Sequence, residues 1–174
     1  MERGTLWSVP NALSISRLFL ALAFVGIPIQ EVRLALILAA ALTDFLDGWL
    51  ARRSNTISRW GELLDPIADR AFVFTALSVL LFEQTITTPQ YFIILSRDLA
   101  TAIAFILARS VVWLRPVAFR ARAAGKVVTA LQLIALVLGL TRPDRIATLI
   151  PFIGIASAIA IADYAAMMWR QRAR

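Results

Sequence analysis

The chain contains no cysteine and no histidine among its 174 residues. Without cysteine it can form neither a disulfide nor a thiolate metal site, and cysteine usage says nothing about its redox compartment. Without histidine it lacks the commonest general base and the commonest ligand of transition metals. Any acid–base chemistry must therefore come from aspartate, glutamate, lysine or tyrosine.

Acidic residues are also scarce, with 11 against 18 basic ones, which leaves a net charge of +7. Such an excess can indicate nucleic-acid binding, but the basic residues lie at the ends of hydrophobic segments and form no soluble basic face. We therefore expect no nucleic-acid partner. The basic residues are better suited to anionic lipid headgroups and to fixing orientation in a bilayer. We also expect no removable signal peptide, because the first residues lack a compact basic-then-apolar pattern with a cleavage site.

Long apolar segments recur through the chain, which is 60% hydrophobic with a mean hydropathy of +0.76. Since a spanning helix needs roughly 20 mostly apolar residues, we predict an all-α, polytopic membrane protein with six transmembrane helices in a single domain, 1–174. Residues 1–9 form either a short interfacial helix or a frayed tail. The predicted spans are about 11–29, 32–52, 60–82, 89–114, 124–140 and 146–169.

Lysine and arginine are distributed unevenly between the two sides that six spans would create. The side with both termini holds Arg3, Arg52, Arg53, Arg59, Arg115, Arg120, Arg122, Lys126, Arg170, Arg172 and Arg174. The other side holds Arg33, Arg142 and Arg145. The positive-inside rule then predicts that both termini lie in the cytoplasm. We expect a protein of the cytoplasmic (inner) membrane. The aspartates considered next would face the cytoplasm too.

Four aspartates, Asp44, Asp47, Asp65 and Asp69, occur within the second and third predicted spans. A carboxylate at membrane depth costs at least a few kcal/mol unless it is paired or bound to a cation. The spacings of three and four residues place each pair on one helical face, and the short connection predicts an antiparallel hairpin that brings the four together. Oxygen ligands alone select a hard cation, so we expect one or two Mg²⁺ ions and favour two, with Mn²⁺ as the alternative.

Small residues and one arginine accompany the aspartates. Gly48, Ala51 and Gly61 leave room for a ligand near the backbone, or alternatively allow close packing between helices. Arg52 is placed to bind a phosphate through two hydrogen bonds, or alternatively sets topology at the membrane surface.

These residues together match every fixed position of the pattern D-x2-D-G-x2-A-R-x8-G-x3-D-x3-D, from Asp44 to Asp69. In this pattern the chain resembles the CDP-alcohol phosphotransferase (CDP-alcohol phosphatidyltransferase) family. The resemblance implies a transferase of phospholipid biosynthesis in which an alcohol attacks a CDP-linked lipid, typically CDP-diacylglycerol, and CMP is released.

The resemblance also implies roles for the motif. Asp44, Asp47, Asp65 and Asp69 would bind the metals, and Asp69 would also act as the general base on the acceptor hydroxyl. The CDP site would be lined by Gly48, Ala51, Arg52 and Gly61. Members of the family are often homodimers, which is an expectation for this chain as well.

The acceptor alcohol has to be inferred from other polar residues. Arg97, Arg120, Arg122 and Lys126 would suit an acceptor that carries its own phosphate, although Arg97 could instead pair with Asp98. The stretches from Val9 to Arg17 and from Gly125 to Gln132 resemble phosphatidylglycerophosphate synthases, which use glycerol 3-phosphate. The Arg97–Asp98 pair instead resembles cardiolipin synthases, which use phosphatidylglycerol. We favour glycerol 3-phosphate, with cardiolipin synthesis and other alcohols as alternatives.

A divalent-cation transporter is the alternative from a different functional class, since it could also place aspartates in a membrane. No second set of carboxylates continues a pathway to the other face, and the Gly48, Ala51 and Arg52 positions would have no explanation. Metal uptake by proteoliposomes without CMP release would identify a transporter.

Overall fold

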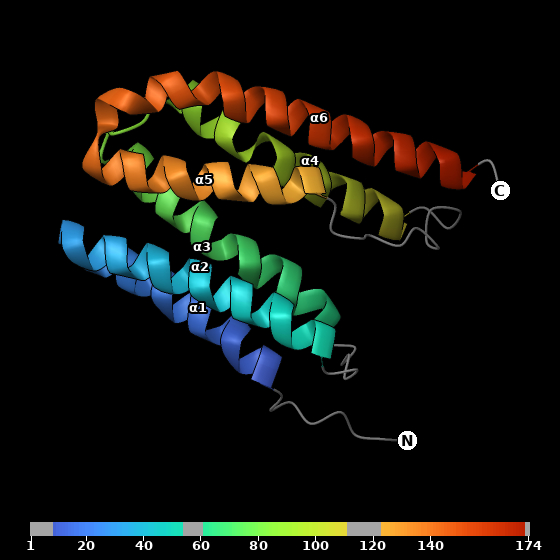
Figure 1. Ribbon diagram of the computed structural model, residues 1–174, viewed down its shortest axis with the longest axis horizontal. Helices are drawn as coiled ribbons and strands as arrows, with labels where there is room; N and C mark the ends of the chain where they lie inside the picture. Colours follow the sequence, from blue (N-terminus) through green and yellow to red (C-terminus); the bar gives the residue numbers. More distant parts are fainter. Residues whose placement is uncertain (1–8, 54–60, 111–122, 173–174) are drawn as a thin grey trace. The chain divides into compact units, whose positions relative to one another are not determined.

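The computed structural model describes the backbone of residues 9–53, 61–110 and 123–172, with side-chain surroundings for 15–46, 70–104 and 124–166. This part of the chain forms six α-helices and one short 3-10 helix (Figure 1). They are α1 (Val9–Gly26), α2 (Gln30–Arg53), α3 (Gly61–Phe82), α4 (Thr88–Ser110), α5 (Ala123–Thr141), η2 (Pro143–Arg145) and α6 (Ile146–Arg172). The all-α prediction is therefore confirmed, and each predicted span corresponds to one helix. Of the predicted interfacial helix at 1–9, residues 1–8 lie outside the described residues, and Val9 is the first residue of α1. The predicted helical residues 111–114 also lie outside the described residues.

The connection after α3 shows how local sequence ends a helix. Gln84 has a positive φ of 58°. Its N–H donates to the carbonyl of Leu81 at 3.0 Å, while the N–H of Thr85 donates to the carbonyl of Leu80 at 2.9 Å. This pair of hydrogen bonds satisfies carbonyls that the end of a helix leaves without partners. The chain then continues into α4, which begins at Thr88.

The chain divides into two compact units. Unit 1 comprises Met1–Thr85 with Gly139–Thr141, and unit 2 comprises Ile86–Leu138 with Arg142–Arg174. The described helices of unit 1 are α1, α2 and α3, while α4, most of α5 and α6 belong to unit 2.

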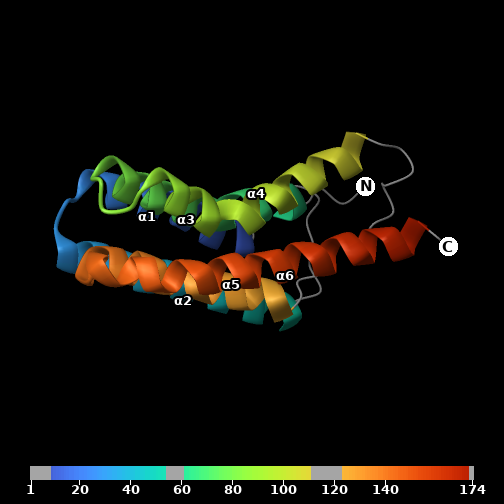
Figure 2. The ribbon, with the colours of Figure 1, turned by 90° about the horizontal axis from the view of Figure 1, so that it is seen from above.

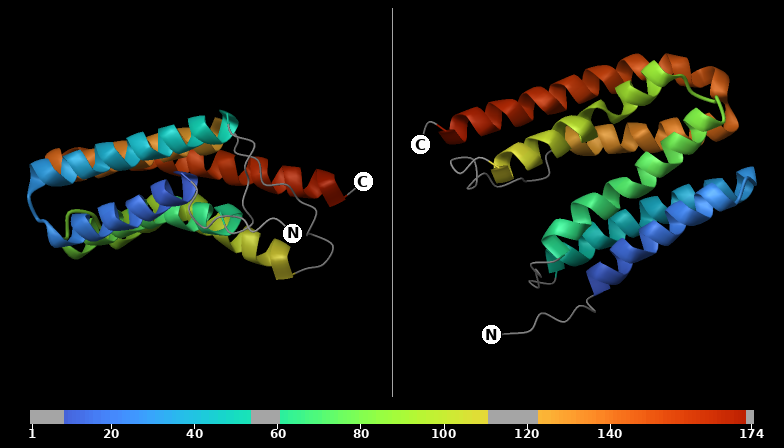
Figure 3. Two further views of the ribbon diagram at one scale, coloured as in Figure 1. Left: turned by 90° about the horizontal axis from the view of Figure 1, so that it is seen from below. Right: turned by 180° about the vertical axis from the view of Figure 1, so that it is seen from behind.

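In unit 1, α1 packs against both α2 and α3 (Figures 1 and 3). Phe24 of α1 and Phe72 of α3 are fully buried, and their rings meet edge to face with centroids 5.8 Å apart. The sequence predicted direct hairpin packing of α2 against α3. Among the described residues the extensive contacts of this unit are those that α1 makes with α2 and with α3. The parts of α2 and α3 that carry most of the motif lie outside the described side chains, so direct packing of these two helices stays a prediction.

A buried arginine joins the three helices of unit 1 at the end of α3. The guanidinium of Arg33 donates to the carbonyls of Phe24 and Ile27 at the end of α1, at 3.2 and 2.9 Å. It also donates to both carboxylate oxygens of Glu83 at 2.9 Å, and it lies 5.1 Å from the ring centroid of Phe24. Arg33 of α2 therefore satisfies carbonyl groups at the end of α1 and pairs with Glu83, the residue that follows α3.

Arg33→Met is expected to lower the thermal unfolding midpoint of the detergent-purified protein. The side chain of Arg33 is 6% exposed, but that of Glu83 is 42% exposed and can regain water. We therefore expect a loss of about 1–3 kcal/mol, less than for a fully buried pair. Arg145→Met is the control, because Arg145 is 67% exposed and its pair with Asp144 spans 3.5 Å. Equal effects of the two substitutions would contradict the structural role of Arg33.

In unit 2, α4 packs along α6, and α5 lies beside α4 (Figures 2 and 3). Ile94 of α4 and Ile153 of α6 are fully buried. Gly154 brings α6 close to α4, since a Cβ atom at that position would lie 3.5 Å from the Cγ2 atom of Ile93. The fully buried apolar residues of α5 among the described side chains are Val128, Ala135 and Leu136.

Within the described residues, two helical segments are long and apolar enough to cross a membrane on length and composition alone. They are Ala124–Thr141 and Pro143–Ala166, and the shorter apolar segments are Ile15–Gly26 and Arg70–Phe82. The other helices carry charged residues inside their apolar stretches, such as Arg33 and Asp44 in α2 or Arg97 and Asp98 in α4. Charged residues of this kind lower the hydropathy of a segment that still has the length of a span.

Candidate active site

The aspartate motif occupies the C-terminal half of α2 and the first turns of α3. Asp44 and Asp47 lie in α2, and Asp65 and Asp69 lie in α3. The helical backbone confirms the local structure on which the spacing argument rests, since residues three and four apart share a helical face. Asp44 is exposed, and the side chains of the other three lie outside the part that the structure describes.

The chemistry of the motif suits a hard divalent cation. All four candidate ligands are carboxylates, and the chain contains no histidine or cysteine to favour a softer metal. Among the described side chains there is no group of three or more potential metal ligands, and of the four aspartates only Asp44 belongs to that set. The residue types therefore fit Mg²⁺, while their convergence on one point stays a prediction.

The residues predicted to line the CDP site belong to the same two helices. Gly48, Ala51 and Arg52 lie in the last turns of α2, and Gly61 is the first residue of α3. The backbone N–H groups at the start of a helix have no partners within it and favour anions. The placement of Gly61 is therefore compatible with a nearby phosphate.

Arg17 of α1 lies next to the motif and is not part of it. Its side chain is 2% exposed, and its guanidinium donates to the carbonyl of Thr43 at 3.5 Å. Thr43 immediately precedes Asp44, so α1 brings a positive charge to the backbone of the carboxylate-bearing helix. The signal that could have identified it is the position of an arginine inside an apolar segment.

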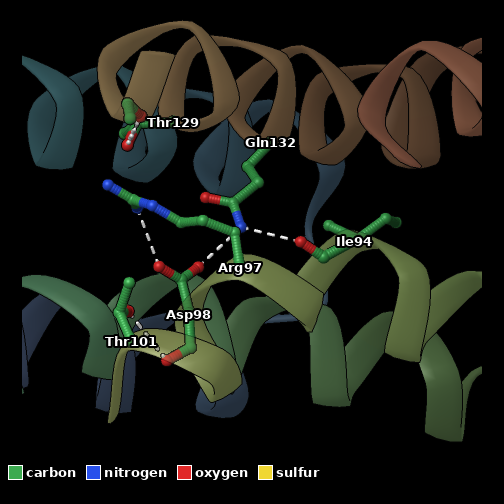
Figure 4. Close-up of polar contacts among 7 residues, drawn as sticks. Ile94, Arg97, Asp98, Thr101, Thr129 and Gln132 are labelled. Carbon is green, nitrogen blue, oxygen red and sulfur yellow. Dashed lines mark hydrogen bonds and ion pairs between the residues drawn. The ribbon is translucent and has the colours of Figure 1, made fainter. Parts of the chain in front are cut away.

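A second polar cluster lies between α4 and α5 in unit 2 (Figure 4). Asp98 is 8% exposed, and one of its carboxylate oxygens accepts a hydrogen bond from Arg97 at 2.8 Å. The other accepts one from Nε2 of Gln132 at 2.6 Å, and the same nitrogen donates to the carbonyl of Ile94 at 2.8 Å. The ion pair with Asp98, the predicted alternative for Arg97, is therefore present.

In this cluster Arg97 lies against Gly125, the residue that precedes Lys126 in α5. A Cβ atom at Gly125 would lie 2.6 Å from a terminal nitrogen of Arg97, so the guanidinium passes directly over this glycine. Lys126 itself is exposed. Of the four predicted acceptor-binding residues, Arg97 therefore lies beside Gly125, the neighbour of Lys126 in sequence. The other two, Arg120 and Arg122, lie outside the described residues.

Comparison with known proteins agrees with the motif. A family model described as CDP-alcohol phosphatidyltransferase matches residues 7–169. A protein of Sodalis glossinidius named CDP-diacylglycerol–glycerol-3-phosphate 3-phosphatidyltransferase is 35% identical over 161 residues, which is 86% of this chain and 84% of that protein.

Two further relatives match over shorter stretches. A protein of Aquifex aeolicus with the same name is 41% identical over 101 residues, or 55% of this chain and 57% of that protein. Human cardiolipin synthase (CMP-forming) is 36% identical over 96 residues, or 53% of this chain and 32% of that protein. With a family match from residue 7 to residue 169 and every fixed motif position present on α2 and α3, the chain belongs to the CDP-alcohol phosphatidyltransferase family.

Proposed function

We propose that the protein transfers the phosphatidyl group of CDP-diacylglycerol to glycerol 3-phosphate and releases CMP, as a step of phospholipid biosynthesis. The observation that carries the proposal is the complete motif on α2 and α3 in a chain whose family match extends from 7 to 169. The names of the Aquifex and Sodalis relatives support this acceptor.

The motif residues have separate tasks in this proposal. Gly48, Ala51 and Gly61 leave space for the CDP moiety, and Arg52 binds one of its phosphates through charge-assisted hydrogen bonds. Asp44, Asp47, Asp65 and Asp69 would hold two Mg²⁺ ions, in keeping with the divalent-metal dependence of the family. When bound, such ions neutralise the charge of the pyrophosphate and of the leaving CMP.

The proton of the acceptor hydroxyl passes to the carboxylate of Asp69. The hydroxyl oxygen forms a bond to the phosphorus that carries diacylglycerol, and the bond from that phosphorus to CMP breaks. Because the chain has no histidine, a carboxylate is the natural base for this step. The products are a phosphodiester and CMP.

We also propose a cytoplasmic-membrane protein with six spans, both termini in the cytoplasm and the motif facing it. Members of the family are embedded in membranes. The orientation follows from the excess of lysine and arginine on the side of the termini.

We further propose that both units belong to one functional domain, since the family match extends through both. We also propose that the protein forms homodimers.

The test is a set of acceptors offered to the detergent-purified protein with CDP-diacylglycerol and Mg²⁺, while CMP release is measured. Glycerol 3-phosphate should be preferred over phosphatidylglycerol and over alcohols without a phosphate. Preference for phosphatidylglycerol would assign the protein to cardiolipin synthesis. That second candidate has its own support in the human relative and in the Arg97–Asp98 pair.

Neutralising Arg97 or Lys126 should raise the KM for the acceptor far more than the KM for CDP-diacylglycerol. We propose that these residues, with Arg120 and Arg122, hold the phosphate of the acceptor. A lost charge-assisted hydrogen bond corresponds to roughly 1.5–3 kcal/mol, or about a tenfold to hundredfold change in KM. Inorganic phosphate or sulfate should compete with the acceptor.

The control is Arg145→Gln, which removes an exposed charge near the start of α6. It should leave both KM values unchanged. A raised donor KM with an unchanged acceptor KM in the Arg97 and Lys126 variants would assign these residues to the lipid donor instead.

A further inference from the structure

The carboxylate of Asp98 is held between two donors from different helices. Because Asp98 is 8% exposed, its charge would be costly without partners. Arg97 supplies one at 2.8 Å from the adjacent position of α4, and Gln132 supplies the other at 2.6 Å from α5 (Figure 4). Gln132 is 2% exposed and also donates to the carbonyl of Ile94 at 2.8 Å. Two hydrogen bonds therefore hold the side-chain amide of Gln132 in place. This amide in turn orients the Asp98 carboxylate that pairs with Arg97.

The guanidinium of Arg97 is constrained from its other side by α5. A Cβ atom at Gly125 would lie 2.6 Å from a terminal nitrogen of Arg97 and 3.5 Å from the central guanidinium carbon. The separation of 2.6 Å is too short for a non-bonded contact. Only glycine at position 125 therefore accommodates the guanidinium where it lies. The side chain of Arg97 keeps 19% exposure.

A guanidinium carries five N–H donors. Among the described residues, the only hydrogen bond of Arg97 is the one to Asp98. In the proposed site a phosphate pairs with the remaining N–H groups, which requires that the side chain keep its direction. An unconstrained arginine would have to lose rotamer freedom when it binds, at a cost to affinity.

We propose that Gln132 and Gly125 are positioning residues for Arg97. Gln132 acts through Asp98 to anchor the guanidinium, and Gly125 provides the space in which it lies. The ligand is a phosphate oxyanion next to a glycerol hydroxyl. This inference rests on the proposed role of Arg97 in acceptor binding and assigns residues that act through it.

Gly125→Ala tests the space beside Arg97. The added methyl group should displace the flexible end of Arg97, while alanine favours the helical backbone of α5, so the thermal unfolding midpoint should not fall. Isothermal titration with glycerol 3-phosphate, without CDP-diacylglycerol, should show affinity roughly three- to tenfold weaker, as for one weakened hydrogen bond. Gly154→Ala is the matched control, because its methyl group would meet Ile93 at an ordinary distance of 3.5 Å.

Gln132→Met tests the anchor, since methionine has a similar length and no donor. It should weaken glycerol 3-phosphate binding by a similar factor and raise the acceptor KM, with kcat and the donor KM within about twofold of wild type. Thr101→Val is the control, because Thr101 donates to the main-chain carbonyl of Asp98 at 3.1 Å and leaves the carboxylate untouched. In an Arg97→Gln background, Gln132→Met should add no further loss.

The outcomes separate this inference from the proposed function. Wild-type affinity in Gly125→Ala and Gln132→Met, with weak binding in Arg97→Gln, would overturn the positioning role alone. An additive loss in the double variant would also overturn it, because Gln132 would then act independently of Arg97.

If Arg97→Gln binds glycerol 3-phosphate as the wild type does, Arg97 is not an acceptor residue and both assignments fail. The expected binding pattern without CMP release would refute the proposed function and leave the positioning role supported. If Gln132→Met does not fold, Gly125→Ala decides the result.

Discussion

Asp69→Asn is expected to retain the fold and to bind CDP-diacylglycerol, yet to lose nearly all turnover. The amide has the shape of the carboxylate but cannot accept a proton from the acceptor hydroxyl. Loss of a general base typically lowers the rate by about 10²–10⁴-fold. Weaker metal binding would add to this loss, and no histidine is present to take over as base.

The measurement is CMP release at saturating glycerol 3-phosphate and Mg²⁺, together with binding of CDP-diacylglycerol to the same preparation. Asp144→Asn is the matched control, because Asp144 is an exposed aspartate in η2, outside the motif. It should have wild-type activity. CMP release near the wild-type rate from Asp69→Asn would refute the assignment of the base.

Asp44→Ala, Asp47→Ala and Asp65→Ala should each abolish activity at ordinary Mg²⁺ concentrations. Each substitution removes a carboxylate that we propose as a metal ligand, and the chain offers no histidine or cysteine in its place. The metal-free variants should also be at least as heat-stable as the wild type, because neighbouring carboxylates repel one another in a medium of low dielectric constant.

Activity should be measured over a range of Mg²⁺ concentrations, and thermal midpoints should be measured in chelator. Glu31→Ala is the control on the same helix, since Glu31 is exposed in the first turn of α2, far from the motif in sequence. It should change neither activity nor metal dependence. Wild-type activity and metal dependence in any one of the three aspartate variants would contradict a shared site.

The sequence alone was enough to predict the helices and the candidate chemistry. Apolar segments of spanning length, separated by short polar or proline-containing stretches, predicted one helix for each segment. Every predicted span corresponds to a helix in the described residues. The motif from Asp44 to Asp69 lies within two neighbouring helices, and the family match includes it. Periodicity and fixed spacing are local properties, so a single sequence displays them directly.

Only the tertiary structure identified the partners of the polar residues in the helices. Arg33 pairs with Glu83, 50 positions away, and Gln132 with Asp98, 34 positions away. Neither pairing follows from a local pattern, because it depends on which helices pack together and in which register. The same holds for α1, which packs against both α2 and α3, and for Gly125, whose missing side chain makes room for Arg97. The sequence determined which helices form and which side chains could bind a metal or a phosphate, whereas packing between helices decided how Arg97 is held.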